Sequence, residues 1–261
     1  MDNDAKLLEK LGESIREALS ASFTASEMLR DRLPEGNTDI DESLAIVRHG
    51  QYRLRLIAEQ LGDIASMRSD SGRPDLARID VVRLCADLAD SVSFFVSFSG
   101  VSVRFECGSE SMNVILDPVR IERMLMELLS NAVRHTHEGR SVRFSLTVTD
   151  DDLVFRITDT GRGLGENKLF APYPDSDPVQ PEIVPGLGLS SAEYIAKLHG
   201  GRLDIETSPD GSSVTVTIPA DRTPLLRLDS PFESYYTCAE SRLLTGLSSV
   251  LTYKFYMSPY L

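Results

Sequence analysis

The stretch from Ile121 to Gly139, IERMLMELLSNAVRHTHEG, restricts the fold of this chain more than any other segment. Its apolar residues recur at steps of three and four, which predicts a helix with a broad buried face. These residues are Met124, Leu125, Leu128, Leu129, Ala132 and Val133. Glu127 and Asn131 lie four residues apart beside that face, and burying either without a partner costs about 1–3 kcal/mol. The fold must therefore provide polar surroundings along one edge of a helix that otherwise belongs in a core.

Charge and composition exclude several classes of protein. The chain has 261 residues, of which 41% are hydrophobic and 26% charged, as in a globular protein, and its net charge is -13. An acidic chain without basic clusters is not expected to bind nucleic acid. The four histidines are scattered and the three cysteines lie far apart, so neither residue type predicts a metal site. The odd cysteine count favours free thiols in a reducing compartment.

Neither a targeting signal nor a membrane span is predicted from the sequence. The N-terminal residues MDNDAK are acidic and lack a targeting pattern. The longest apolar-leaning run, VSFFVSFSGVSV (92–103), is too short and too rich in serine to cross a bilayer. We therefore expect a cytoplasmic location and no integral membrane segment.

Residues 1–68 carry two apolar seams, and the segment PEGNTD (34–39) separates them. The first seam alternates steps of three and four as in a coiled coil, and consists of Leu8, Leu11, Ile15, Ala18, Ser22, Ala25 and Leu29. The second consists of Ile40, Leu44, Val47, Leu54, Leu61 and Ile64. A two-helix hairpin cannot hide both seams alone, so we expect a homodimer that forms a four-helix bundle. The alternative is that the helical pair packs on its own domain.

A polar linker spans residues 69–76, and the segment 77–220 mixes helices with strands. Helices are predicted near 81–96, 118–137 and 188–199. Strands are predicted near 101–107, 112–116, 141–150, 153–159, 201–208 and 212–219, where residues alternate between apolar and polar. The whole chain is thus predicted to be α+β, with a helical hairpin followed by an α/β sandwich whose mixed sheet has helices on one face.

Three short elements stand out within residues 77–220. They are Glu127-x-x-x-Asn131, DTGRGL with Asp159, Gly161 and Gly163, and PGLGL with Gly186 and Gly188. Each is weak alone, because glycine-containing turns are common and a G-x-G before a helix occurs in many folds. A dinucleotide-binding motif does not fit, since Ser191 stands where that motif has glycine.

Together and in this order, the elements resemble the N, G1 and G2 boxes of the ATP-binding domain shared by sensor histidine kinases, the Hsp90 and gyrase ATPases and the anti-sigma-factor serine kinases. DPVRIERMLMELLSNAVRHT (117–136) is similar to the histidine-kinase version of the first box. LFAP (169–172) resembles the F box of that family, and GLGLSSAEYIAKLHGGRLDIETSPDGSSVTVTIP (186–219) resembles its closing half. The resemblance covers residues 77–220 and implies an ATP–Mg²⁺ site.

The resemblance also implies roles for individual residues. Asn131 would hold the Mg²⁺ that bridges the nucleotide phosphates, and Glu127 would face the same cavity as a candidate catalytic base. Asp159 would accept a hydrogen bond from the adenine amino group, while Gly161 and Gly163 let the backbone run close to the base. The remaining candidates are Arg134 for phosphate charge, His135 as a pocket wall, Gly186, Leu187, Gly188 and Leu189 at the lid hinge and the following helix start, and Ser212 on the adenine side.

The hairpin resembles the dimerisation and phosphoacceptor domain of histidine kinases but lacks their acceptor. IREALSASFTASEMLRDRL (15–33) aligns without gaps to the stretch that follows the acceptor histidine, which places Glu13 at the acceptor position. A glutamate has no imidazole nitrogen to accept a phosphoryl group. His49 is the only histidine of the hairpin, and we expect a solvated residue on the helix surface rather than an acceptor.

Three hypotheses for function stay open. The first is an ATP-dependent enzyme that transfers the γ-phosphoryl group to a protein side chain in a two-component-type pathway, with a response-regulator-like partner. The second is a silent pseudokinase, an ATP-gated dimeric scaffold that binds such a partner. The third is an ATPase in which Glu127 activates water. Residues 221–261 extend beyond the resemblance, and either fold back on the ATP-binding domain or the hairpin or dock a partner.

Overall fold

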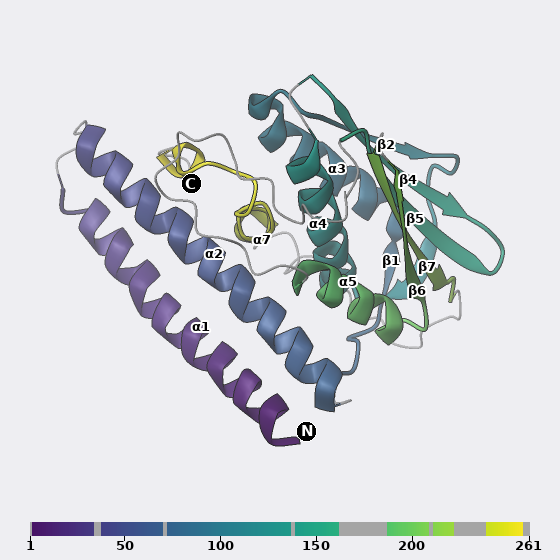
Figure 1. The fold of residues 1–261 in the computed structure, drawn as a ribbon, viewed down its shortest axis with the longest axis horizontal. Coiled ribbons are helices and arrows are strands. Elements are labelled where there is room, and N and C mark those ends of the chain that lie inside the picture. The colour runs from purple at the N-terminus through teal and green to yellow at the C-terminus, as the bar shows by residue number, and fades with distance from the viewer. Residues whose placement is uncertain are drawn as a thin grey trace. The chain divides into compact units, whose positions relative to one another are not determined.

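The computed structural model describes residues 2–33, 38–69, 72–136, 139–161, 187–208, 211–221 and 239–257 (Figure 1). These residues form two compact units. The helical unit contains residues 2–69 and 244–257, and the α/β unit contains the described residues between 72 and 243. The predicted order of a helical region followed by a mixed α/β sheet with helices is confirmed.

In the helical unit, α1 (Asp2–Arg30) and α2 (Thr38–Ser69) form the predicted hairpin. The two backbones approach closely at Gly12, where an added Cβ would lie 3.2 Å from the carbonyl oxygen of Ala58. Polar contacts also join the helices. The side-chain amide of Gln51 donates to the hydroxyls of Ser22 and Ser26, at 2.9 and 2.7 Å. The contact face of the hairpin therefore includes small and polar residues beside the aromatic pair Phe23 and Tyr52.

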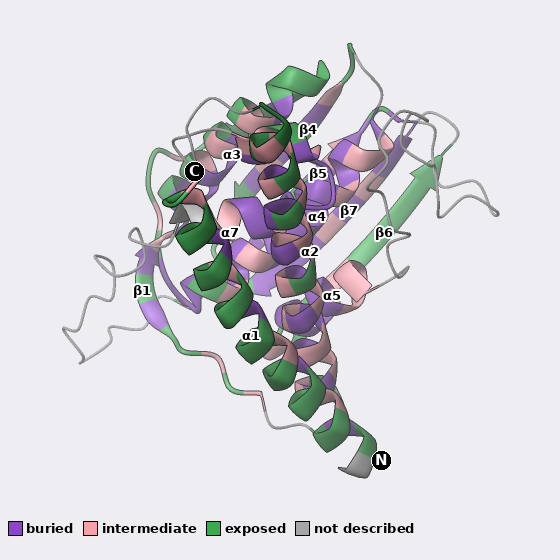
Figure 2. Cartoon of the chain, turned by 90° about the vertical axis from the view of Figure 1, so that its left-hand side faces the viewer, coloured by how far each residue is buried: buried purple, intermediate pink, exposed green. Residues whose placement is uncertain are grey.

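The predicted apolar seams remain largely outside this contact face. On α1, Leu11 and Leu29 are 47% and 52% exposed, and on α2 Val47 and Leu54 are 46% and 48% exposed. Exposed residues run along most of α1 in Figure 2. Exposed apolar side chains of this size are unfavourable in water, and the hairpin retains two apolar stripes that its own packing does not cover.

The end of the chain adds a third component to the helical unit. The helix α7 (Ala239–Gly246) precedes the 3-10 helix η2 (Tyr253–Met257), and η2 packs against α2. Residues 244–257 thus fold back on the hairpin, which is one of the alternatives that the sequence left open for the tail.

The α/β unit contains two sheets. In the smaller one, β1 (Ala77–Asp80) pairs antiparallel with β3 (Asn113–Leu116). The larger sheet has the order β2-β4-β5-β7-β6, with bounds Ser102–Cys107 for β2, Ser141–Val148 for β4, Asp152–Asp159 for β5, Gly211–Pro219 for β7 and Arg202–Ser208 for β6. The pair β2–β4 is parallel and the other pairs are antiparallel. The predicted hairpin pairs β4–β5 and β6–β7 are both confirmed.

Three helices cover one face of the larger sheet (Figure 1). They are α3 (Val81–Val96), α4 (Pro118–His135) and α5 (Leu187–Leu198), and a short 3-10 helix, η1 (Ser97–Ser99), extends α3. The apolar stripe of α4 is fully buried as predicted, with Met124, Leu125 and Leu129 at 0% exposure. The helix α4 ends at His135, two residues before the predicted end, and α5 begins at Leu187, one residue before its predicted start.

His199 joins the end of α5 to the start of α4. Its Nε2 accepts a hydrogen bond from the backbone N–H of Asp117 at 3.1 Å, and its Nδ1–H donates to the carbonyl of Ile195 at 2.8 Å. An N–H can only donate and a carbonyl can only accept, so this pair of bonds requires the neutral imidazole. Burial lowers the pKa of His199 below its ordinary value of 6.5, although the Ile195 carbonyl and Asp117 favour the proton.

Acid is expected to destabilise the α/β unit through His199. Above pH 6.5 the imidazole is neutral in both the folded and the unfolded chain, and its contribution to stability is complete. As the pH falls below 6.5, the unfolded chain binds the proton before the folded chain does. The free energy of unfolding therefore decreases until the pH has passed the lower pKa that His199 has in the folded state.

His199→Gln tests this expectation, because the amide oxygen can accept from Asp117 but does not titrate. Urea unfolding midpoints should fall less in this variant than in the wild type between about pH 7.5 and about pH 5. The remaining acid sensitivity would report His135, whose pKa is also lowered by burial. Equal pH dependence in the two proteins would contradict the assignment.

Candidate functional site

Asp159 is the centre of the candidate site, at the end of β5. Its carboxylate is buried, with 7% exposure, and Oδ1 accepts two backbone hydrogen bonds. The donors are the N–H groups of Gly161 at 2.9 Å and Ser212 at 3.3 Å. Within the described residues, no donor is bonded to the second oxygen, Oδ2. The backbone therefore fixes the carboxylate through one oxygen, and the other is available to a ligand.

The two glycines beside Asp159 have a steric role. A Cβ at Gly161 would lie 2.1 Å from the carbonyl oxygen of His135 and 2.9 Å from Asp159 Oδ1. A Cβ at Gly211, where φ is +148°, would lie 2.1 Å from the carbonyl oxygen of Asp159. Both contacts are far inside van der Waals distance, so only glycine allows the turn after β5, the start of β7 and the end of α4 to meet.

Gly211 was not among the residues singled out from the sequence. Its only signal was its place at the start of the alternating run 212–219, which does not distinguish it from an ordinary turn glycine. Its importance follows from the pairing of β5 with β7, where Thr158 lies opposite Ser213. That register places Gly211 and Ser212 beside Asp159.

The helix α4 carries four further predicted residues. Glu127 is buried with 8% exposure, while Asn131, Arg134 and His135 are half-buried. Burial lowers the pKa of His135, the positive charge of Arg134 lowers it further, and the negative charge of Asp159 opposes both. The carbonyl of His135 also meets Gly161, as described above. The structure thus brings Asp159, Gly161, Ser212 and the end of α4 together.

The sequence predicts the phosphate side of the site at the start of α5. Leu187, Gly188 and Leu189 are half-buried and lie in the first turn of the helix, and α5 packs against α4. N–H groups in a first turn have no partner within their own helix, which suits them to bind an anion. Gly188 is the second residue of the helix and thus lies past the predicted hinge. Gly163 and Gly186 lie outside the described residues.

The metal-binding capacity of the described residues is limited. No group of three or more His, Cys, Asp or Glu side chains gathers among them in a way that could hold a metal ion. Mg²⁺ prefers oxygen ligands and commonly combines one or two protein groups with substrate phosphates. The amide oxygen of Asn131 fits that donor set as a single protein ligand, with the nucleotide and water supplying the others.

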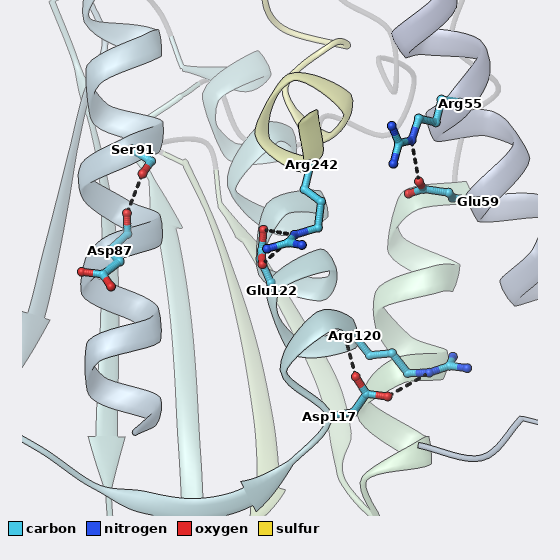
Figure 3. A network of polar contacts seen from close by, with 8 residues as sticks. All are labelled: Arg55, Glu59, Asp87, Ser91, Asp117, Arg120, Glu122 and Arg242. Carbon is cyan, nitrogen blue, oxygen red and sulfur yellow. Dashed lines mark hydrogen bonds and ion pairs between the residues drawn. The ribbon is translucent and has the colours of Figure 1, made fainter. Parts of the chain in front are cut away.

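Acidic residues at the start of α4 hold the helix in place (Figure 3). Asp117 caps it by accepting from the N–H of Arg120 at 3.0 Å, and also accepts from the N–H of Asp75 at 2.8 Å. Glu122 is 5% exposed and receives Nε of Arg242, at 3.2 Å from each carboxylate oxygen. Removing one partner of such a buried pair leaves an uncompensated charge. Sequence reasoning missed this pair, since 120 residues separate its members.

The described helices give no indication of a membrane span. None of them combines the length and the apolar character that crossing a bilayer requires.

Known proteins with similar sequences and folds lie in one group. The family model for histidine kinase-, DNA gyrase B- and HSP90-like ATPases matches residues 116–222. The signal transduction histidine-protein kinase AfsQ2 of Streptomyces coelicolor is 27% identical over 235 residues, which cover 84% of this chain and 42% of AfsQ2. The chain spans only 34% to 42% of the length of AfsQ2, KinB and MtrB, three similar curated relatives.

Solved structures share the fold. Full-length ShkA in complex with AMPPNP aligns with a TM-score of 0.62 and 20% identity, covering 85% of this chain and 47% of ShkA. Histidine kinase ThkA in complex with the response regulator TrrA aligns with a TM-score of 0.53 and 19% identity, covering 85% of this chain and 63% of ThkA. The sequence match and the fold agree, and residues 116–222 therefore carry an ATPase domain of the histidine kinase-, DNA gyrase B- and HSP90-like type.

Proposed function

We propose that this chain is an ATP-binding, histidine-kinase-like signalling protein that transfers the γ-phosphoryl group of ATP to a protein side chain in a two-component-type pathway. The observation that carries the proposal is the buried carboxylate of Asp159, which two backbone N–H groups hold through Oδ1. A fixed acceptor of this kind suits the amino group of adenine. The match of residues 116–222 to an ATPase family supports the same ligand.

The adenine would bind between the turn after β5 and the end of α4. Asp159 Oδ2 would accept from the adenine amino group, because Oδ1 is already engaged. Gly161 would let the base approach the backbone, His135 would form a wall of the pocket, and Ser212 would lie on the adenine side. Neutral His135 suits such a wall, since burial and Arg134 lower its pKa.

The phosphates would lie toward Asn131, Arg134 and the first turn of α5. Mg²⁺, when bound by Asn131, supplies positive charge that neutralises the phosphate oxygens. Arg134 would add a second positive charge, and the N–H groups of Leu187, Gly188 and Leu189 would donate to phosphate oxygens. Gly163 and Gly186 complete the proposed cofactor-binding set. Catalysis would come from positioning and charge neutralisation, as in other phosphoryl transfer enzymes.

The hairpin is proposed to form a homodimer. The exposed stripes on α1 and α2 include Leu11, Leu29, Val47 and Leu54, and a second copy would cover them as a four-helix bundle. The partner is proposed to be a response-regulator-like protein, since the structurally similar ThkA is known in complex with the response regulator TrrA. The domain limits proposed from the sequence are a hairpin over 1–68, a linker over 69–76, an ATP-binding domain over 77–220 and an extension over 221–261.

One observation favours the second candidate, a catalytically silent scaffold. Glu13 is exposed but offers no imidazole, and His49, the only histidine of the hairpin, is 3% exposed. In the described state no hairpin histidine can therefore meet a phosphoryl donor. ATP occupancy would then control the shape of the dimer rather than supply a phosphoryl group.

Incubation of the purified protein with γ-labelled ATP and Mg²⁺ separates these functions. Phosphoryl transfer predicts slow incorporation of acid-labile label that Asn131→Ala does not acquire. A scaffold predicts Mg²⁺-dependent ATP binding without label. An ATPase predicts release of labelled phosphate that Glu127→Ala abolishes while ATP binding remains. Failure to bind ATP at all would contradict the proposed function.

A further inference from the structure

Residues 244–257 form a cover on α2. Most of their apolar side chains are buried, with Leu247 at 0%, Tyr256 at 2% and Leu251 at 4% exposure, while Phe255 and Met257 are half-buried. The hydroxyl of Tyr256 donates to the carbonyl of Leu244 at 3.1 Å, which closes the segment on itself. The segment is therefore a folded element with its own internal contact.

The cover lies directly over His49, which is 3% exposed. The His49 Nε2 lies 2.9 Å from the carbonyl oxygen of Ser248, and the ring stacks on Tyr256 with centroids 5.0 Å apart and 24° between the planes. A carbonyl can only accept, so Nε2 carries the proton in this state. The expectation of a solvated surface histidine is wrong, because a segment about 200 residues away in sequence covers it.

Two further contacts hold the cover on the same face of α2. The hydroxyl of Tyr253 donates to the carboxylate of Glu42, and the Tyr256 ring lies 5.5 Å from that of Tyr52. Glu42 and His49 are seven residues apart, so they share one face of the helix.

Other contacts between α1 and α2 use a different face of α2, while Tyr52 contacts both Phe23 of α1 and Tyr256 of the cover. Gln51 bonds to Ser22 and Ser26, and the backbone of Ala58 lies against Gly12. Gln51 and Ala58 are also seven residues apart, but their face is rotated from that of Glu42 and His49. The hairpin therefore has contacts of its own that do not pass through the cover.

We infer that residues 244–257 are an autoinhibitory cover, and that His49 accepts a phosphoryl group only when this cover is displaced. While the cover is docked, the ring is shielded from any donor by Ser248 and Tyr256. The inference rests on the proposed function for its phosphoryl donor, ATP. The inference also explains why the one histidine of the hairpin, His49, is buried.

When the cover is displaced, His49 can react with the γ-phosphoryl group of ATP. The unprotonated ring nitrogen of His49 attacks the γ-phosphorus and forms the N–P bond. The bond from that phosphorus to the β,γ-bridging oxygen breaks, and ADP leaves with its electron pair. The other ring nitrogen releases its proton to solvent, so the product is a neutral phosphohistidine ring.

Diethyl pyrocarbonate modification of His49 in the full chain, measured by peptide mass spectrometry, tests the cover without using ATP. Leu247→Asp should open it, since a carboxylate cannot be buried there without a partner, and should raise the His49 modification rate about tenfold. Val119→Asp is the matched control, because Val119 is 49% exposed in the first turn of α4, where an acidic residue is tolerated. It should leave the rate unchanged.

Tyr253→Phe provides a milder variant in case Leu247→Asp perturbs the hairpin. It removes only the hydroxyl that bonds Glu42 and should raise the rate roughly 2- to 10-fold at unchanged helicity. Equal His49 modification rates in the wild type and both variants would contradict a displaceable cover. A loss of helicity in both variants would also contradict it, because the hairpin would then depend on residues 244–257 for its folding.

Labelling with γ-labelled ATP then tests the acceptor. Leu247→Asp should increase acid-labile label on His49 about as much as it increases its modification rate, and His49→Ala in that background should remove the label. If His49 of Leu247→Asp is modified faster but acquires no label, in protein that still binds ATP, His49 is not the acceptor. The cover itself would still be supported by the modification rate. Protein that binds no ATP would instead contradict the proposed function, while the modification rates would still decide whether the cover exists.

Discussion

Asp159→Asn is expected to weaken ATP binding by about 10- to 100-fold. The variant keeps an oxygen that can accept from the N–H groups of Gly161 and Ser212, so the turn should retain its shape. Its amide nitrogen, however, would present N–H donors to the adenine amino group, where the wild type presents an acceptor. Replacing a charge-assisted hydrogen bond with two opposed donors costs about 1.5–3 kcal/mol, which corresponds to that range of affinity.

Titration calorimetry with ATP and with inosine triphosphate would measure this effect. The wild type should prefer ATP, because inosine carries an oxygen in place of the amino group, and Asp159→Asn should lose or reverse the preference. Asp152→Asn is the matched control, since Asp152 begins the same strand whose last residue is Asp159. An unchanged affinity in Asp159→Asn, at an unchanged melting temperature, would show that adenine does not bind at this carboxylate.

Local patterns were sufficient to predict most of the elements. The alternation in 141–150 and 153–159 predicted β4 and β5 as neighbours, and their antiparallel pairing is observed. The apolar stripe of α4 predicted a buried helix, and Met124 and Leu125 of that helix are at 0% exposure. The strand β1 escaped prediction because four residues, Ala77–Asp80, are too few to show an alternation.

Contacts over long sequence separations could not be predicted. The burial of His49 depends on Ser248 and Tyr256, and that of Glu122 depends on Arg242. Nothing in the local pattern around either residue distinguishes a covered side chain from a solvated one. The parallel pairing of β2 with β4 has the same origin, since alternation predicts a strand but not its neighbour.

The candidate site was predictable in its residue types but not in its steric detail. The motif at Asp159 and Gly161 identified the acceptor and one glycine, whereas the need for Gly211 emerged only from the register of β5 and β7. Both glycines lie against Asp159, Gly161 at the carboxylate oxygen Oδ1 and the end of α4, and Gly211 at the backbone carbonyl.

Gly161→Ala is consequently expected to impair both stability and ATP binding. A Cβ at this position would lie 2.1 Å from the His135 carbonyl, and the obstacle is backbone at the end of a buried helix. The turn must move away from α4 to relieve the overlap, which we expect to cost about 1–3 kcal/mol in the free energy of unfolding. The same movement pulls the Gly161 N–H from Asp159 Oδ1, so the carboxylate would lose part of its fixed orientation.

Gly108→Ala separates this steric effect from the general effect of removing a glycine. A Cβ at Gly108 meets no atom within 4 Å, and its φ is not in the left-handed region. It should therefore leave stability within about 0.5 kcal/mol of the wild type and ATP affinity unchanged. If Gly161→Ala matched Gly108→Ala in urea unfolding and in ATP titration, the close approach of this turn to α4 would not exist in solution. Loss of affinity at full stability would instead show that the turn can move freely and that its position matters only for the nucleotide.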